Sequence, residues 1–193
     1  MNICIFGSAS DRVAEKYIAE VEKLGEILAE KGHSLVFGAG SRGLMGASAR
    51  GFARKGGKIY GVIPTFFKNE YIEEVYMDCT ELTYTETMAQ RKAKMEDLAD
   101  AFIIAPGGIG TFEEFFEVLT LKQLRRHTKP IAIYNIFGYY DSLIDSISYS
   151  MDEKFINTTC KELFTVLNTP DEVLEFLAND QPLKRSVSEL KNG

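Results

Sequence analysis

Residues 106–114 read Pro-Gly-Gly-Ile-Gly-Thr-Phe-Glu-Glu and combine a glycine turn with a hydroxyl and two carboxylates. Glycine has no Cβ atom, so the backbone can turn sharply and approach a ligand closely. If a helix begins here, its first amides lack intrahelical partners and the helix dipole adds positive charge, which suits a phosphate. Thr111 supplies a hydroxyl donor, and Glu114 lies in the first helical turn, near any such ligand.

A plain turn is the alternative interpretation, because glycine loops between a strand and a helix also occur in proteins that bind nothing there. One Gly-x-Gly is weak evidence of a site. Three glycines in four residues, followed by threonine and paired carboxylates, exceed what packing requires. The pattern therefore favours a ligand site at this turn.

Short apolar runs alternate with helical periodicity along the chain, and they predict the elements that position this turn. We expect strands at residues 2–6, 34–37, 58–63, 82–85, 101–105, 131–136 and 164–167. We expect helices at about residues 18–31, 44–55, 88–98, 111–124 and 141–153, with a last one from 170. Residues 65–79 are less regular and predict a loop or a short helix. This alternation predicts an α/β fold with one parallel sheet and helices on both faces.

The predicted fold occupies one domain, residues 1–178, followed by a polar C-terminal tail at residues 179–193 that frays from residue 181. Glycine turns follow the predicted strands that end at Phe6, Phe37 and Ala105. The carboxyl ends of parallel strands share one edge, and ligands bind there near the point where strand order reverses. The three turns are therefore expected to face one crevice.

A dinucleotide site is opposed by two features of the sequence. The first turn lacks the Gly-x-Gly-x-x-Gly pattern, and Gly38 stands where a ribose-binding acid is expected. No glycine loop has the P-loop ending, and no serine stands in a Gly-x-Ser-x-Gly elbow. His33 and His127 lie in polar surroundings and are interpreted as surface residues. A mononucleotide-sized crevice remains.

Arg91 and Lys92 follow the fourth predicted strand, about one turn into a helix. Arg91 shares the less polar helix face with Met88 and Met95, and an inward-pointing arginine needs an anionic partner. A solvated basic face is the alternative, with Lys92 and Glu96 as an ordinary pair four residues apart.

Composition limits the class of protein. The 193 residues suffice for one domain with a sizeable core. The net charge of −6 argues against a general nucleic-acid binder, although a few local cations suffice for a small phosphorylated ligand. The three widely spaced cysteines predict neither a disulfide framework nor a metal site. The absence of a signal peptide and of a membrane-length apolar run fits a cytoplasmic location.

Several motifs together resemble the LOG ("Lonely guy") family of cytokinin riboside 5′-monophosphate phosphoribohydrolases, often mislabelled lysine decarboxylases. They are the glycine-rich residues 38–46, the pattern Met88-x-x-Arg91-Lys92, the turn at residues 106–114 and residues 138–143. The similarity spans about residues 2–177. It implies a Rossmann-like homodimer without a cofactor. It also implies hydrolysis of AMP or an N6-substituted AMP to the free base and ribose 5-phosphate.

The resemblance also implies roles for single residues. Arg91 and Glu114 match the family's catalytic residues. The implied substrate-binding residues are Glu70, Lys92, Gly107, Gly108, Ile109, Gly110, Thr111, Glu113 and Thr120. The chemistry agrees, because glycosidic cleavage builds positive charge on the sugar and a carboxylate can stabilise it or activate water.

The sequence departs from the family's motifs at three places, and two other functions stay open. Ala89 stands where many relatives have histidine, the first turn has no glycine after its serines, and Ala39 separates two glycines of the second. These differences leave base preference open more than reaction type. A non-catalytic nucleotide carrier or sensor would keep the glycine turns, and another nucleoside monophosphate could be the substrate.

Overall fold

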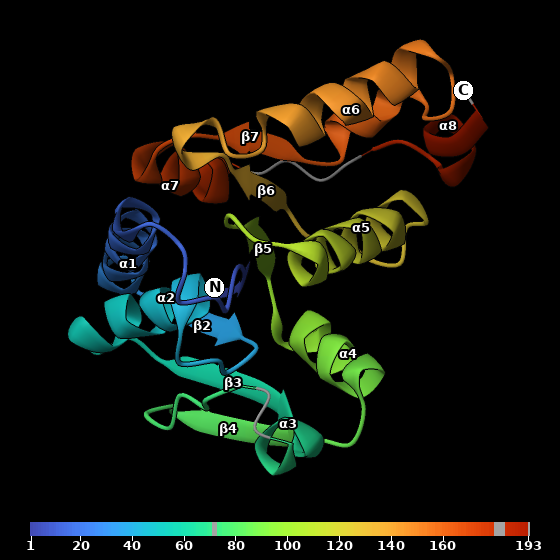
Figure 1. The fold of residues 1–193 in the computed structure, drawn as a ribbon. Helices are drawn as coiled ribbons and strands as arrows, with labels where there is room; N and C mark the ends of the chain where they lie inside the picture. Colours follow the sequence, from blue (N-terminus) through green and yellow to red (C-terminus); the bar gives the residue numbers. More distant parts are fainter. Residues whose placement is uncertain (71–72, 180–183, 193) are drawn as a thin grey trace.

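The computed structural model describes residues 1–70, 73–179 and 184–192, which form one seven-stranded parallel sheet (Figure 1). The strand order is β4-β3-β2-β1-β5-β6-β7, and every neighbouring pair is parallel. The strands are β1 (Asn2–Phe6), β2 (Ser34–Phe37), β3 (Ile59–Pro64), β4 (Glu81–Thr85), β5 (Ala101–Ile104), β6 (Ile131–Tyr134) and β7 (Thr165–Leu167). The α/β prediction is confirmed.

Helices connect the strands and cover both faces of the sheet, as Figure 1 shows. The α-helices are α1 (Glu15–Glu30), α2 (Gly43–Arg54), α3 (Thr65–Asn69), α4 (Met88–Leu98), α5 (Ile109–Gln123), α6 (Asp141–Asp152), α7 (Pro170–Asn179) and α8 (Val187–Asn192). Two 3₁₀ turns, η1 (Ile136–Gly138) and η2 (Thr158–Glu162), complete the described elements.

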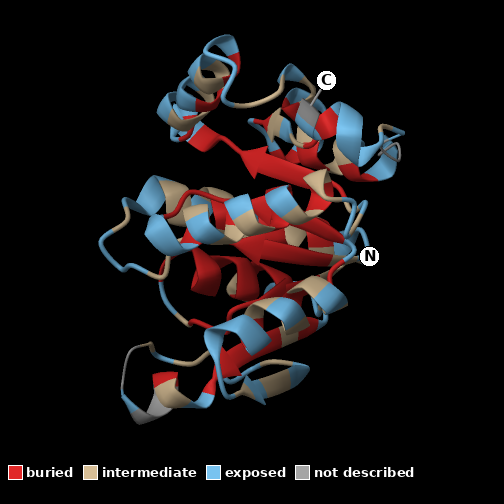
Figure 2. Ribbon diagram, turned by 90° about the vertical axis from the view of Figure 1, so that its right-hand side faces the viewer, coloured by how far each residue is buried: buried red, intermediate tan, exposed pale blue. Residues whose placement is uncertain are grey.

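Two apolar cores lie on opposite faces of the sheet. Successive strand residues point to opposite faces, so Ile3 and Ile5 pack with α1 and α2, whereas Cys4 and Phe6 pack with α4, α5 and α6. The central strands are therefore buried on both sides, and Figure 2 shows them buried beneath helices whose outer faces are exposed. This burial explains why their sequences are almost continuously apolar.

The strand order reverses between β1 and β5, because β1 to β4 extend in one direction from this point and β5 to β7 in the other. The turns after these two strands begin at Gly7 and Ala105, so they flank the position where such sheets bind ligands. The sheet therefore places residues 106–114 beside the first glycine turn, as the sequence predicts.

Two predictions about the elements need correction. The helix after the central turn begins at Ile109, two residues before the expected start, so the glycine turn itself forms its first residues. The prediction of a frayed tail is wrong for α8, which packs on α5 and η2 and buries Leu190 completely. Residues 180–183 and 193 lie outside the described residues, and the domain boundary at residue 178 stays a prediction.

Candidate functional site

A crevice of about 360 Å³ opens at the carboxyl ends of the central strands, and all three glycine turns or their helices contribute to it. The first turn supplies residues 7–10, the helix after the second supplies Met45, and the third supplies Gly108 and Gly110. The remaining lining residues are Phe67, Glu73, Met88, Arg91, Thr111, Glu113 and Glu114. The expectation that the turns face one crevice is confirmed for the first and third turns, whereas the second turn itself does not line it.

Backbone hydrogen bonds join the turns to one another. The amide of Ser8 donates to the carbonyl of Pro106 at 3.0 Å, and the amide of Leu44 donates to the carbonyl of Ser8 at 2.7 Å. Tyr139 and Tyr140 brace the third turn, since their hydroxyls donate to the carbonyls of Gly107 at 2.6 Å and Ala105 at 2.8 Å. The three turns therefore form one linked wall of the crevice.

The N-terminus of α5 offers unpaired backbone donors to the crevice. Gly108 is the N-cap residue, and no side chain caps the helix. Within the described residues, the amides of Ile109, Gly110 and Thr111 make no hydrogen bond, whereas the next amide already donates to the carbonyl of Gly108 at 3.0 Å. These amides and the helix dipole suit an anion, as the sequence predicts.

Arg91 reaches the crevice from α4, which Thr87 caps by accepting a hydrogen bond from the amide of Gln90 at 3.2 Å. The Arg91 side chain is only 4% exposed, and its Nε and Nη2 donate to the carbonyls of Val62 at 3.2 Å and Gly38 at 3.1 Å. Backbone carbonyls therefore hold Arg91, and no described residue forms an ion pair with it, so the anionic partner expected from the sequence stays a prediction.

Gly38 has a structural reason for being glycine. A Cβ atom there would lie 1.6 Å from Nη2 of Arg91, so any larger residue would displace the guanidinium. The position at which a dinucleotide-binding sheet carries an acidic residue is used here to admit an arginine from α4. Gly38 and Arg91 therefore depend on each other.

Glu114 lies in the second turn of α5, because the helix begins at Ile109, and not in the first turn as the sequence predicts; it lines the crevice together with Arg91. Burial raises the pKa of Glu114 to about 7; the positive charge of Arg91 opposes the shift, and the negative charges of Glu113 and Glu73 add to it. A carboxyl group with a pKa near neutrality can exchange a proton with a reacting molecule at physiological pH. This side chain is the strongest candidate for chemistry in the crevice.

Glu73 is a crevice residue that the sequence reasoning missed. It lines the crevice, whereas Glu70, the acid proposed from the sequence, is exposed and does not line it. The buried Oε2 atom of Glu73 has no hydrogen-bond partner within the described residues. Burial raises the pKa of Glu73, and Arg91 opposes that shift. Several acids lie in this irregular segment, and no local pattern in the sequence distinguishes the one that points inward.

Lys92, Glu113 and Thr120 differ in their relation to the crevice. Lys92 forms ion pairs with Glu113 and with Glu117, the latter at 2.7 Å, and not with Glu96, the partner in the alternative interpretation. Glu113 lines the crevice, whereas Lys92 does not line it and is connected to it through its ion pair with Glu113. Thr120 lies further along α5 and lines a separate hollow of about 410 Å³ with Phe116 and Phe155.

Two kinds of feature are absent from the described part of the chain. No helix among these residues is both long and apolar enough to span a bilayer. No group of three or more histidine, cysteine or acidic side chains among them is arranged to hold a metal ion.

Comparison with known proteins identifies both a family and a fold. Residues 45–177 match the family model described as "Possible lysine decarboxylase". A probable cytokinin riboside 5′-monophosphate phosphoribohydrolase of Oryza sativa subsp. japonica is 38% identical over 98% of this chain and 76% of its own. A cytokinin riboside 5′-monophosphate phosphoribohydrolase of Arabidopsis thaliana is 37% identical over 93% and 84%. The molybdenum cofactor carrier protein of Chlamydomonas reinhardtii shares the fold, with a TM-score of 0.68, 21% identity and coverage of 92% and 98%.

Proposed function

Because this chain belongs to the LOG family of cytokinin riboside 5′-monophosphate phosphoribohydrolases, we propose that its crevice hydrolyses AMP or an N6-substituted AMP. The chain is an enzyme of the N-glycosidase type, and its products are the free base and ribose 5-phosphate. One observation carries the assignment to this crevice: Glu114, with a pKa of about 7, lies one helical turn from free backbone amides.

The phosphate binds the amides of Ile109, Gly110 and Thr111, so the ribose lies over Glu114. Binding energy from this remote phosphate positions the sugar for the reaction. As the bond between C1′ and the base breaks, its electron pair leaves with the base and positive charge develops on the sugar. The carboxylate of Glu114 stabilises that charge and accepts a proton from the water whose oxygen joins C1′. That proton returns to the departing base.

Arg91 acts on Glu114 through its positive charge, which affects the pKa of Glu114, and forms no direct ion pair with it. Its guanidinium is fixed by two carbonyls, and its charge counters the effect of burial on the pKa of Glu114. Without that charge, two inward-facing acids, Glu73 and Glu114, would both retain protons more strongly. Arg91 therefore keeps the ionised form of Glu114 available near neutral pH.

Other binding roles extend this proposal. We assign to Glu73 the ligand contact expected of Glu70, because Glu73 lines the crevice and its buried Oε2 atom has no hydrogen-bond partner within the described residues. Lys92 acts through Glu113, to which it is ion-paired. Thr120 could contact a nucleotide only if a second copy brought α5 against the crevice. The exposed Phe116 and Phe155 beside Thr120 support such a homodimer, which, like the cytoplasmic location, stays a proposal.

Two other functions are less well supported. A lysine decarboxylase that uses a lysine-bound cofactor would need a lysine in its site, and none of the described residues that line the crevice is a lysine. A carrier would have no use for a carboxylate with a pKa near 7 beside the anion site. The carrier protein with the same fold is too distant in sequence to assign its function here.

The test is a base-release assay with AMP, GMP, CMP, UMP and N6-substituted AMP. We expect free adenine or the N6-substituted base, with an equal amount of ribose 5-phosphate. Tight binding of the nucleotide without release of a base would support the carrier, and faster release from a pyrimidine monophosphate would assign a different substrate. The assay therefore separates the three functions left open by the sequence.

Gly108→Ala is expected to weaken phosphate binding without affecting the fold. A Cβ at Gly108 would meet no atom within 4 Å, and the backbone there is extended, so alanine fits. The methyl group would occupy space beside the free amides. We expect KM for AMP to rise about tenfold or more, a loss of about 1.4 kcal/mol in binding, with Tm unchanged. An unchanged KM in a well-folded variant would contradict phosphate binding at this turn.

The pH dependence of kcat/KM is expected to follow the ionisation of Glu114. Its carboxylate is the active form, so activity should fall as the pH decreases below about 7. Glu113→Gln removes a negative charge that raises the pKa of Glu114. The acid limb of the kcat/KM profile of this variant should therefore lie at lower pH than that of the wild type. Initial rates between about pH 5 and pH 9 test both points. A flat profile across neutral pH would exclude Glu114 as the titrating group.

A further inference from the structure

Tyr139 lies behind the third glycine turn, outside the crevice, and belongs to residues 138–143, a motif to which the proposed function assigns no role. It lines a smaller hollow of about 230 Å³ together with Gly107 and Gly108, and of these three residues only Gly108 also lines the crevice. The Tyr139 hydroxyl donates to the carbonyl of Gly107 at 2.6 Å, although the residue is 42% exposed. Water can satisfy an exposed hydroxyl, so this bond is not required to pair a buried group.

The carbonyl oxygens of three consecutive residues, 105–107, are all held by groups outside the turn. In sequence order they accept from the Tyr140 hydroxyl, the Ser8 amide and the Tyr139 hydroxyl. Each peptide unit is planar and trans, so its N–H points away from its carbonyl oxygen. A group that fixes the carbonyl therefore also fixes the direction of the next amide.

The three fixed peptide units differ in what their amides can do. The first leads into Pro106, which has no N–H. The second leads to the amide of Gly107, which is already used: burial and Tyr139 raise the pKa of Tyr140, and a hydrogen bond from this amide opposes that shift. The third leads to the amide of Gly108, which donates to no described residue. Of the three units, the one held by Tyr139 therefore offers the free donor.

The direction of the Gly108 amide follows from the side on which Tyr139 lies. The Gly107 carbonyl points toward Tyr139 and the smaller hollow, so the N–H across the same peptide plane points the other way, toward the crevice. There it adds to the amides of residues 109–111 at the N-terminus of α5. A hydrogen bond to the carbonyl also polarises the peptide unit and strengthens its N–H as a donor.

The loop that carries Tyr139 is itself fixed. The side chain of the buried Asn135 donates from Nδ2 to Oδ1 of Asp141 at 2.8 Å and accepts at Oδ1 from the amide of Tyr140 at 2.7 Å. Gly138 has a φ of +70°, and a Cβ atom there would lie 2.6 Å from Oδ2 of Asp141. The rings of Tyr139 and Tyr140 pack edge to face, with centroids 4.9 Å apart. The hydroxyl is therefore presented to the turn from a rigid support.

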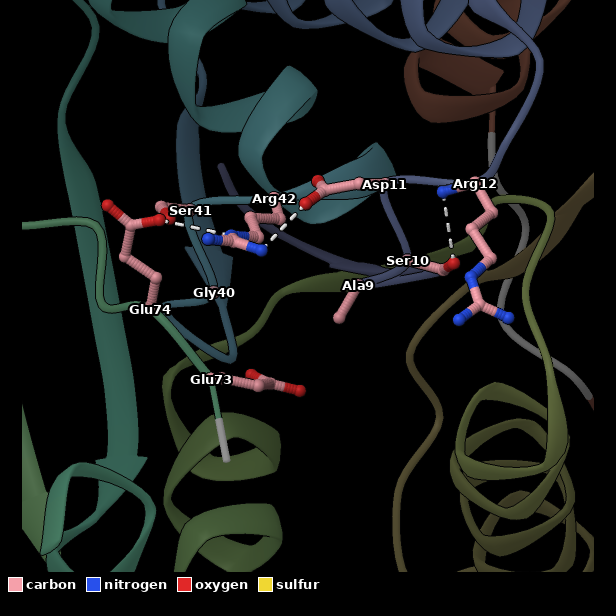
Figure 3. Close-up of a pocket in the computed structure, with 9 residues that line it drawn as sticks. All are labelled: Ala9, Ser10, Asp11, Arg12, Gly40, Ser41, Arg42, Glu73 and Glu74. Atoms are coloured by element: carbon pink, nitrogen blue, oxygen red, sulfur yellow. Dashed lines mark hydrogen bonds and ion pairs between the residues drawn. The ribbon is translucent and has the colours of Figure 1, made fainter. Parts of the chain in front are cut away.

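The other supports of the turn do not depend on Tyr139. The Ser8 amide that holds the middle carbonyl belongs to the first glycine turn, which continues to Asp11; Figure 3 shows Asp11 paired with Arg42. Nη1 of Arg42 lies 2.9 Å from Oδ2 of Asp11, and the carbonyl of Ser8 accepts from the amide of Leu44 at 2.7 Å. Removal of the Tyr139 hydroxyl should therefore release one peptide unit and leave the rest of the wall in place.

From this geometry, which rests on the proposed function, we propose that Tyr139 is a positioning residue for the 5′-phosphate of the substrate. Its hydroxyl fixes the Gly107 carbonyl and thereby directs the Gly108 amide at the phosphate, as a fourth backbone donor. Tyr139 touches neither the substrate nor the bond that breaks. It therefore strengthens the binding of the phosphate and takes no part in the proton transfers of Glu114.

The test is Tyr139→Phe, which removes the hydroxyl and retains the ring. We expect KM for AMP to rise about fivefold, as for one lost hydrogen bond, with kcat within about twofold of the wild type and Tm unchanged. The inhibition constant of ribose 5-phosphate should rise by the same factor as KM, whereas that of adenine, which has no phosphate, should not change. In amide NMR spectra, ribose 5-phosphate should shift the Gly108 signal less in the variant than in the wild type.

Tyr140→Phe is the matched control, because it removes more hydrogen bonding from the turn but none from the peptide unit that carries the Gly108 amide. Its hydroxyl holds the carbonyl of Ala105 and accepts from the amide of Gly107. Since Tyr140 is buried, Tm should fall, whereas KM for AMP should rise by less than about twofold.

Two results in the kinetic comparison would overturn the proposal. One is an unchanged KM in Tyr139→Phe; the other is a KM that rises at least as much in Tyr140→Phe, which would indicate a general loosening of the turn. Equal weakening of adenine and ribose 5-phosphate by Tyr139→Phe would overturn it as well. Failure to release a base from any monophosphate would instead overturn the proposed function, and the binding of ribose 5-phosphate to both variants would still test the role of Tyr139.

Discussion

Glu114→Gln is expected to bind AMP with nearly wild-type affinity and to lose about 10³-fold in kcat, because the amide can neither accept the proton of water nor stabilise positive charge on the sugar. The amides of Ile109, Gly110 and Thr111, to which we propose that the phosphate binds, are unchanged in this variant. Nucleotide affinity by calorimetry and base release by chromatography give the two quantities separately.

Glu117→Gln is the control for this result. Glu117 lies one turn further along α5 and is ion-paired with Lys92, but it does not line the crevice. Its loss of kcat should therefore be far smaller than that of Glu114→Gln. Equal turnover in the Glu114 variant and the wild type would remove this carboxylate from the mechanism.

The same Glu114→Gln variant should be more stable than the wild type at alkaline pH. The pKa of Glu114 is raised from 4.5 to about 7, so the folded protein holds this proton more tightly than the unfolded chain. The associated stability is complete below about pH 4.5 and is lost as the pH rises through about 7. Above that pH, Glu114→Gln should gain up to about 3 kcal/mol in the free energy of unfolding. Urea unfolding at about pH 4.5 and about pH 8 measures the difference.

Arg91→Met is expected to lower kcat by about 10²-fold and to shift the acid limb of the pH profile upward. Arg91 lowers the pKa of Glu114, so its removal leaves less of the carboxylate at neutral pH. The carbonyls of Val62 and Gly38 also lose their donors, which should destabilise the fold by about 1–3 kcal/mol.

Arg91→Lys separates the two effects of Arg91→Met. Lysine restores the positive charge but cannot reproduce the two directed hydrogen bonds of the guanidinium. Its pH profile should therefore lie closer to that of the wild type, while part of the stability loss persists. An acid limb at the wild-type pH in Arg91→Met would show that Arg91 does not control the ionisation of Glu114.

The fold was predictable because its elements follow local patterns. The apolar strands are buried on both faces, and each glycine turn marks the end of a strand. Residues close in sequence, such as Gly108 and Glu114, were also predictable as neighbours in the crevice, because one strand, one turn and one helix hold them together. These are short-range relations that periodicity and turn chemistry specify.

Long-range relations were not predictable. Arg91 is held by carbonyls 29 and 53 residues away, and carbonyls carry no residue-specific signal in a sequence. Glu73 enters the crevice from an irregular segment, where no periodicity indicates direction. The helix α8 depends on packing against α5 and η2, which its own polar sequence does not reveal. Each miss involves a tertiary contact.

The most direct test of the central claim is a crystal structure of the Glu114→Gln variant with AMP bound. We expect the phosphate to accept hydrogen bonds from the amides of Ile109, Gly110 and Thr111, with C1′ of the ribose facing the substituted side chain at position 114. A phosphate bound elsewhere, or C1′ turned away from position 114, would contradict the account.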